Sequence, residues 1–209
     1  MHRLSTIRIN VARVTGYSSL VEALLTTWEL RDFRPHSITT ESTARHRLTI
    51  LKKMNVSRDE LLSNLGNIVS TTQDRVTSLQ EVANLIRSHA RYRWVGLYQV
   101  DHAAGVVTNL AWSGPGAPEY PTFPLTKGLT GAAVAERKTV NVGDVSADLR
   151  YLTAFGTTRS EIIVPVFDRD RRNVIGTIDV ESEEPNAFSK DVQAVLQACS
   201  EVIQSLWEV

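Results

Sequence analysis

Three carboxylates stand inside a pair of strand-like segments in residues 160–181. The segments are rich in β-branched residues, and the charged stretch 168–172 between them is typical of a β-hairpin. Both strands are expected to be mostly buried, yet they contain Glu161, Asp179 and Glu181. Carboxylates are seldom buried without a partner or a task, so this hairpin is a candidate for one wall of a small polar pocket.

The spacing of these acids favours a shared site. Asp179 and Glu181 are two residues apart, and a strand directs such side chains to the same face. Paired carboxylates suit a primary ammonium group or hydroxyl donors of a ligand, and their mutual repulsion can keep one of them protonated at neutral pH. Two simpler interpretations stay open: the acids lie on a solvent face of the sheet, or they pair with Arg93 and Arg159.

Aromatic residues supply further candidates. Trp94 and Tyr98 are four apart in a period-two segment, so they line whatever covers that strand face, as ligand contacts or as ordinary core residues. Tyr120, in a Gly- and Pro-rich loop, either covers the pocket or packs within the loop. His89 and His102 are isolated and lack the spacing of metal ligands, so we expect no metal site and no cofactor.

Composition excludes several classes of protein. The 209 residues are 42% hydrophobic, and Lys+Arg and Asp+Glu both number 23, so no global charge favours nucleic acid. No run of 18 apolar residues predicts a membrane span. Cys199 is the only cysteine, which excludes an intrachain disulfide and a paired-thiol redox centre. With no signal-peptide core, the lone cysteine favours a cytoplasmic location.

The chain divides into two unequal parts. Residues 1–60 carry 10 basic and 6 acidic side chains, and we interpret residues 1–55 as a basic extension that is poorly ordered or loosely packed. The extension resembles a transit peptide or a mistranslated upstream segment, since Met54 is the only later methionine. Residues 56–209 are predicted to form one folded domain.

Within that domain, hydrophobic periodicity predicts alternating helices and strands. Helices are expected from about residue 57, over about 78–90, near 125–135 and from 189 onward; strands are expected at 94–100, 106–112, 139–142 and on both sides of 168–172. Long loops are expected at 113–124 and 143–158. The order predicts an α+β fold with a central antiparallel sheet flanked by helices.

The order of these elements and the sequence motifs within them resemble a GAF domain over residues 61–209. The segments that carry the resemblance are Trp94-Val95-Gly96-Leu97-Tyr98, Pro124 to Gly131, Arg159 to Pro165, and Gly176 to Ser182. The first of them narrows the resemblance to the free methionine-(R)-sulfoxide reductases, which bind free methionine sulfoxide in the GAF pocket and reduce it with cysteines. The resemblance implies that the first and last helices pack together on one face of the sheet, and that the domain pairs through them as a homodimer.

Carried over residue by residue, the resemblance implies a binding pocket without its thiols. The family's substrate-cradling aromatics match Trp94 and Tyr98, and its pocket carboxylates match Glu161, Asp179 and Glu181. Its three cysteines fall instead on or near residues without a thiol: Tyr120, Thr130 and Ala154. Sulfoxide reduction of this kind needs an attacking thiolate and a second thiol to release the product, and a threonine hydroxyl supplies neither.

Three functions therefore remain, of which the first is favoured and the other two are alternatives. The first is a non-catalytic GAF module, such as a sensor, that binds a small polar, amino-acid-like ligand. The second is an L-methionine (R)-S-oxide reductase, which would have to act through Cys199 and an external thiol. The third is a ligand-free module for dimerisation or protein interaction.

Overall fold

The computed structural model describes residues 57–71, 74–153 and 155–208. The expectations for the extension 1–55 and for Ala154 lie outside the described residues. Among the described helices, none combines the length and the apolar character needed to cross a bilayer.

The domain is built on one six-stranded antiparallel sheet with the order β3-β2-β1-β6-β5-β4. The alternating segments form its long central strands, as predicted from their period-two pattern. The strand bounds are β1 Trp94–Asp101, β2 Val106–Ser113, β3 Thr122–Pro124, β4 Val140–Val142, β5 Ser160–Phe167 and β6 Val174–Ser182. The α+β fold class expected from the sequence is confirmed.

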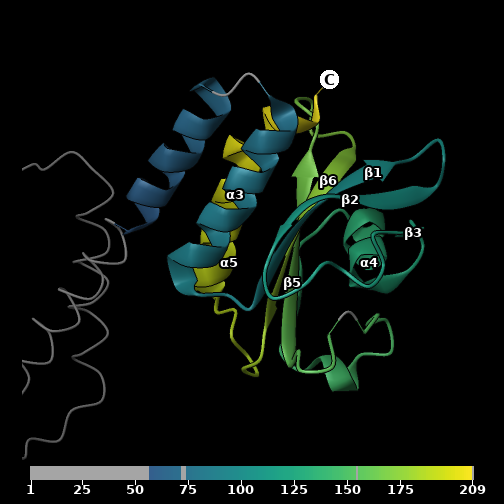
Figure 1. The fold of residues 1–209 in the computed structure, drawn as a ribbon. Helices are drawn as coiled ribbons and strands as arrows, with labels where there is room; N and C mark the ends of the chain where they lie inside the picture. Colours follow the sequence, from purple (N-terminus) through teal and green to yellow (C-terminus); the bar gives the residue numbers. More distant parts are fainter. Residues whose placement is uncertain (1–56, 72–73, 154, 209) are drawn as a thin grey trace, which may run out of the picture. The chain divides into compact units, whose positions relative to one another are not determined.

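Helices cover both faces of the sheet unequally (Figure 1). The helix 57–71, α3 (Arg75–Ala90) and α5 (Lys190–Val202) lie on one face, and the short α4 (Gly128–Glu136) lies on the other. Two 3-10 turns complete the domain, η1 (Val145–Ala147) and η2 (Gln204–Trp207).

The main core lies between the sheet and the three helices. β5 and β6 contribute Ile162, Val164, Ile178 and Val180, each at most 1% exposed, and the helices contribute apolar residues at helical spacing. Cys199 of α5 is fully buried in this core. The other face of the same strands is therefore free to carry different chemistry.

Two local elements differ from the sequence prediction. α3 begins at Arg75 rather than near residue 78, because the carboxylate of Asp74 accepts a hydrogen bond from the backbone N–H of Thr77 and caps the helix there. β3 lies inside the segment 113–124, where the sequence predicts a loop, and Phe123 pairs with Val107 of β2. A three-residue strand is too short to show alternation in the sequence.

Candidate functional site

The register of three neighbouring strands brings the predicted carboxylates together. Glu161 of β5 lies directly opposite Glu181 of β6, and Glu181 in turn lies opposite Trp94 of β1. Asp179 lies two residues away on the same face of β6. We call the resulting cavity the carboxylate pocket; its lining includes all of the residues expected to contact a ligand, namely Trp94, Tyr98, Glu161, Asp179 and Glu181.

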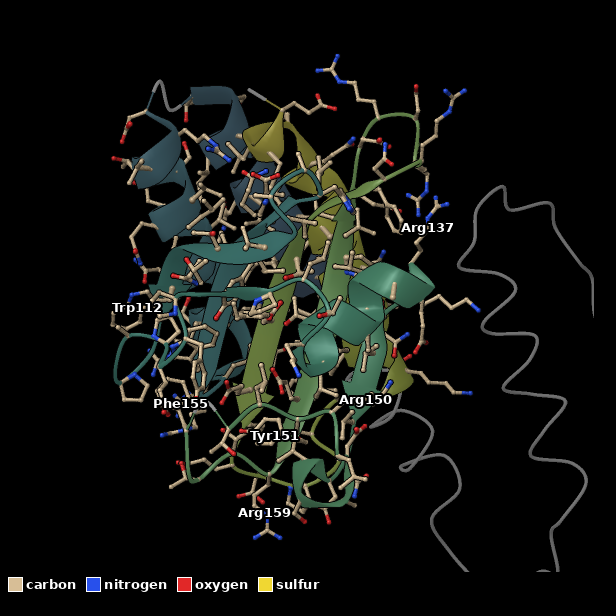
Figure 2. All side chains as sticks on the ribbon, turned by 90° about the vertical axis from the view of Figure 1, so that its right-hand side faces the viewer. Trp112, Arg137, Arg150, Tyr151, Phe155 and Arg159 are labelled. Carbon is tan, nitrogen blue, oxygen red and sulfur yellow. The ribbon has the colours of Figure 1, made fainter. Side chains whose placement is uncertain are left out.

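These three carboxylates are buried, so the solvent-face interpretation does not hold. Glu161 is 9% exposed, Asp179 4% and Glu181 1%. The alternative of pairing with arginines is not found either. The Arg93 guanidinium forms its ion pair with Glu183, at 2.8 Å, and Arg159 is exposed and points away from the ribbon (Figure 2).

Two threonine hydroxyls, rather than cationic side chains, donate hydrogen bonds to the carboxylates. Thr130 Oγ1 donates to Asp179 Oδ2 at 2.8 Å, and Thr158 Oγ1 donates to Glu181 Oε2. Asp179 Oδ1 is buried with no hydrogen-bond partner among the described residues. The pocket thus presents at least one buried carboxylate oxygen without a hydrogen bond, which favours an incoming donor.

Burial makes all three groups hold protons more tightly than usual. Burial and the neighbouring acids Glu181 and Asp179 raise the pKa of Glu161 well above its ordinary value. Burial raises the pKa of Asp179 to about 7, although the hydroxyls of Thr177 and Thr130 oppose the rise. Burial raises the pKa of Glu181 to about 7 as well, against the lowering effects of the Thr158 hydroxyl and the Arg93 charge. Asp179 and Glu181 therefore titrate near neutral pH and are only partly ionised there.

Aromatic rings form the apolar wall of the pocket. The rings of Trp94 and Tyr98 lie 6.4 Å apart between centroids, and Phe123 meets Tyr98 edge-on at 5.8 Å. Trp94 Nε1 donates to the Gly116 carbonyl oxygen at 3.1 Å, and Phe155 packs on the indole at 5.7 Å. Rings held on several sides form a rigid surface beside the carboxylates.

Glycines give these rings their space, and sequence reasoning assigned them no role. A Cβ atom on Gly96 would lie 2.2 Å from the Trp94 ring and 2.8 Å from the Tyr98 ring. A Cβ on Gly114 would lie 2.3 Å from the same indole. A glycine inside an alternating strand is the signal that could have identified Gly96, because it marks a close approach of other groups. Thr158 carried no comparable signal.

The space inside the carboxylate pocket is small. The cavity volume is about 40 Å³, room for a few water molecules, whereas sites for small molecules generally measure roughly 300–1,000 Å³. Pro118, Tyr120 and Leu152 from the two long loops also line it, and Tyr120 is 45% exposed. Trp112 of β2, which lies on the same side of the view as Phe155 (Figure 2), is not among the lining residues. A ligand larger than water needs these loops to move outward.

The carboxylate pocket contains no thiol that could take part in redox chemistry. Cys199 lies on α5, in the core on the opposite face of the sheet, where burial raises the pKa of its thiol to about 12. Tyr120 and Thr130, where two of the family's cysteines are expected, both line the carboxylate pocket. Across the described part of the chain, no group of three or more His, Cys, Asp or Glu side chains is arranged to hold a metal ion.

Comparison with known proteins identifies the domain. Residues 74–205 match the family model described as the GAF domain. GAF domain-containing protein A of Dictyostelium discoideum is 26% identical over 132 residues, which span 63% of this chain and 80% of that protein. The GAF fold expected from the sequence is confirmed.

Solved structures of free methionine-R-sulfoxide reductases are among the similar folds. The type II enzyme from Thermoplasma acidophilum is 30% identical with a TM-score of 0.60, and the match covers 64% of this chain and 92% of that one. The enzyme from Neisseria meningitidis, solved in complex with its substrate, is 27% identical with a TM-score of 0.65, and the match covers 84% of this chain and 95% of that one.

Proposed function

Since this chain belongs to the GAF domain family, we propose that it binds a small polar ligand bearing a primary ammonium group, as an amino acid does, in the carboxylate pocket. The observation that carries this proposal is the meeting of three buried carboxylates, none of which forms an ion pair with a described residue. An ammonium group supplies three donors and a positive charge, and it would satisfy Asp179 Oδ1. Trp94 and Tyr98 would hold the apolar part of the ligand.

The position of the only cysteine argues against reduction of the ligand. A reductase needs a thiolate that reaches the substrate, and the single thiol lies across the sheet with a raised pKa. We therefore propose a binding module, most simply a sensor, rather than an enzyme. With dithiothreitol and free methionine (R)-sulfoxide, we expect no formation of methionine. Turnover that disappears in Cys199→Ser would reverse this assignment.

Thermal unfolding with candidate ligands tests the binding proposal. A ligand at about 100 times its Kd stabilises a protein by about 2.7 kcal/mol, which is roughly 5–10 °C in Tm for a domain of this size. The set is free methionine (R)-sulfoxide, its (S)-epimer, methionine and cyclic nucleotides, and we expect a shift with the (R)-sulfoxide. Asp179→Asn should abolish the shift, while Glu184→Gln, an exposed carboxylate outside the pocket, should retain it.

If none of these ligands shifts Tm, the amino-acid pocket is wrong and the interaction module becomes the better account.

For the assembly, we propose a homodimer through the helix 57–71 and α5. Both helices keep partly buried apolar side chains at the margin of the core, among them Leu62, Val69, Val192 and Val195. Light scattering coupled to size-exclusion chromatography measures the mass, and a monomer at micromolar concentration would exclude this dimer. The lone cysteine suits a reducing, cytoplasmic compartment.

A further inference from the structure

A second and larger cavity lies away from the carboxylate pocket. Its volume is about 500 Å³, within the range of small-molecule sites. It opens between the end of α4, the second half of β5 and the outer side of α5. We call it the polar cleft; its basic lining residues are Arg137, Lys138 and Arg171, and its acidic ones are Asp168 and Glu201.

Two arginines converge on one aromatic ring at this cleft. The guanidinium carbon of Arg171 lies 4.9 Å from the centroid of the Phe167 ring, and that of Arg137 lies 5.9 Å from it. Arg137 also donates to the backbone carbonyl of Arg171. Figure 2 shows Arg137 beside the loop that joins β5 and β6, on the opposite side of the view from Phe155. Like charges held close together favour an anion between them.

The acidic residues Asp168 and Glu201 cancel only part of the charge of the three cations that line the cleft. Both carboxylate oxygens of Asp168 accept hydrogen bonds from its own turn, from the backbone N–H groups of Arg172 and Asn173 and from the Asn173 amide. Glu201 pairs with Arg171 at 3.3 Å. Lys138 makes no ion pair with any described residue, and Arg137 pairs with no carboxylate there.

The cleft suits a small molecule better than an added peptide strand. β4 pairs only with residues 161–163 of β5, so the edge of β5 is open beyond them, but Pro165 offers no N–H there. The Gln197 side chain bridges the cleft to Thr139 Oγ1 at 2.9 Å, across the path of a strand. Gln193 and Gln204 add amide groups that suit hydroxyl groups of a ligand.

We propose that the polar cleft binds a small phosphorylated molecule, with the phosphate held by Arg137, Arg171 and Lys138. A phosphate group offers three terminal oxygens and a charge near −2, which matches three cationic side chains better than a carboxylate does. The glutamines of α5 would contact the rest of the ligand. This site is independent of the carboxylate pocket and of the function proposed for it.

The test is an NMR titration of the full chain with two probes, inorganic phosphate and ribose 5-phosphate. At about 10 mM, a site with a Kd near 1 mM is roughly nine-tenths filled. We expect the side-chain amide signals of Gln193 and Gln197 to shift, while the Trp94 indole signal stays in place. A stronger response to the ester indicates a phosphorylated metabolite, and an equal response indicates free phosphate. Signals that stay in place with both probes, or a shift of the indole alone, would overturn the proposal.

Backbone conformation provides matched variants that should still fold. Arg137 and Arg171 both have φ of 53°. Arg91, which ends α3 and does not line the cleft, has φ of 54°. Glycine is favoured at such angles, so each Arg→Gly change removes a guanidinium without backbone strain. We expect Arg137→Gly and Arg171→Gly each to weaken phosphate binding roughly tenfold, as for a lost charge-assisted hydrogen bond, and Arg91→Gly to leave it unchanged. Equal losses in all three variants would show a non-specific charge effect and contradict a built site.

Discussion

The two faces of β5 and β6 carry opposite chemistry on one backbone. Towards the helices, Ile162, Val164, Ile178 and Val180 form a dry core with almost no exposed surface. Towards α4, Glu161, Asp179 and Glu181 bring three acids into a space almost as buried. Burial of the apolar side chains is favourable, whereas burial of the three carboxylates is costly, because none of them forms an ion pair with a described residue. The face towards the three helices therefore contributes stability throughout, whereas the face towards α4 combines buried apolar side chains such as Leu129 and Ile163 with three carboxylates whose burial is costly.

The largest effect is expected on the apolar face. Ile178→Ala removes a fully buried side chain from the main core and should lower the free energy of unfolding by about 4 kcal/mol, through lost transfer energy and the cavity left behind. Urea unfolding measures the change. Val76→Ala, a change at a side chain that is 68% exposed on α3, is the control and should change stability by less than about 0.5 kcal/mol. Equal effects of the two variants would refute this assignment of the core.

On the acidic face, a substitution is expected to raise the free energy of unfolding rather than lower it. The pKa of Asp179 rises from 3.8 to about 7, so the folded protein holds this proton more tightly than the unfolded chain. The contribution of this protonation to the free energy of unfolding is fully present below pH 3.8 and is lost as pH rises through about 7. Asp179→Asn should remove that loss and raise the free energy of unfolding at pH 8 by up to about 4 kcal/mol.

Urea unfolding of wild type and Asp179→Asn at pH 5 and pH 8 measures this effect. The difference between the two proteins should grow with pH, while Glu184→Gln should behave as wild type at both values. A variant that is more stable yet does not bind would identify Asp179 as a residue kept for binding. Destabilisation at pH 8 would instead show that the charge is satisfied in the fold.

A smaller effect on stability is expected from a change in the shape of the pocket that leaves its charge unaltered. Gly96→Ala places a methyl group against the rings of Trp94 and Tyr98 and should cost about 2 kcal/mol, the usual penalty for overpacking, as well as ligand binding. Gly66→Ala is the control: it lies in the helix 57–71 with nothing within 4 Å of the added Cβ, and should gain about 1 kcal/mol. Thermal unfolding distinguishes the two signs. If both variants gained stability, the rings would not need Gly96.

Local patterns were enough to predict much of this protein. Period-two alternation identified the long strands and placed Asp179 and Glu181 on one face, because side-chain direction in a strand depends only on neighbouring residues. Serine at position 189 correctly indicated the start of α5, where its hydroxyl accepts from the N–H of Val192. The lone cysteine limits the redox chemistry of the chain whatever its fold, because a disulfide within the chain needs two thiols.

Other features were decided only in three dimensions. The register that sets Glu161 opposite Glu181, and the threonines that hold the carboxylates, depend on pairs of residues 20 or more positions apart. The volume of the carboxylate pocket depends on side chains from two distant loops, and the polar cleft on the ends of α4 and β5 and the side of α5. The sequence alone determined which residues face each way. Tertiary structure decided which of them meet, because closeness in space follows from the packing of the whole chain rather than from local spacing.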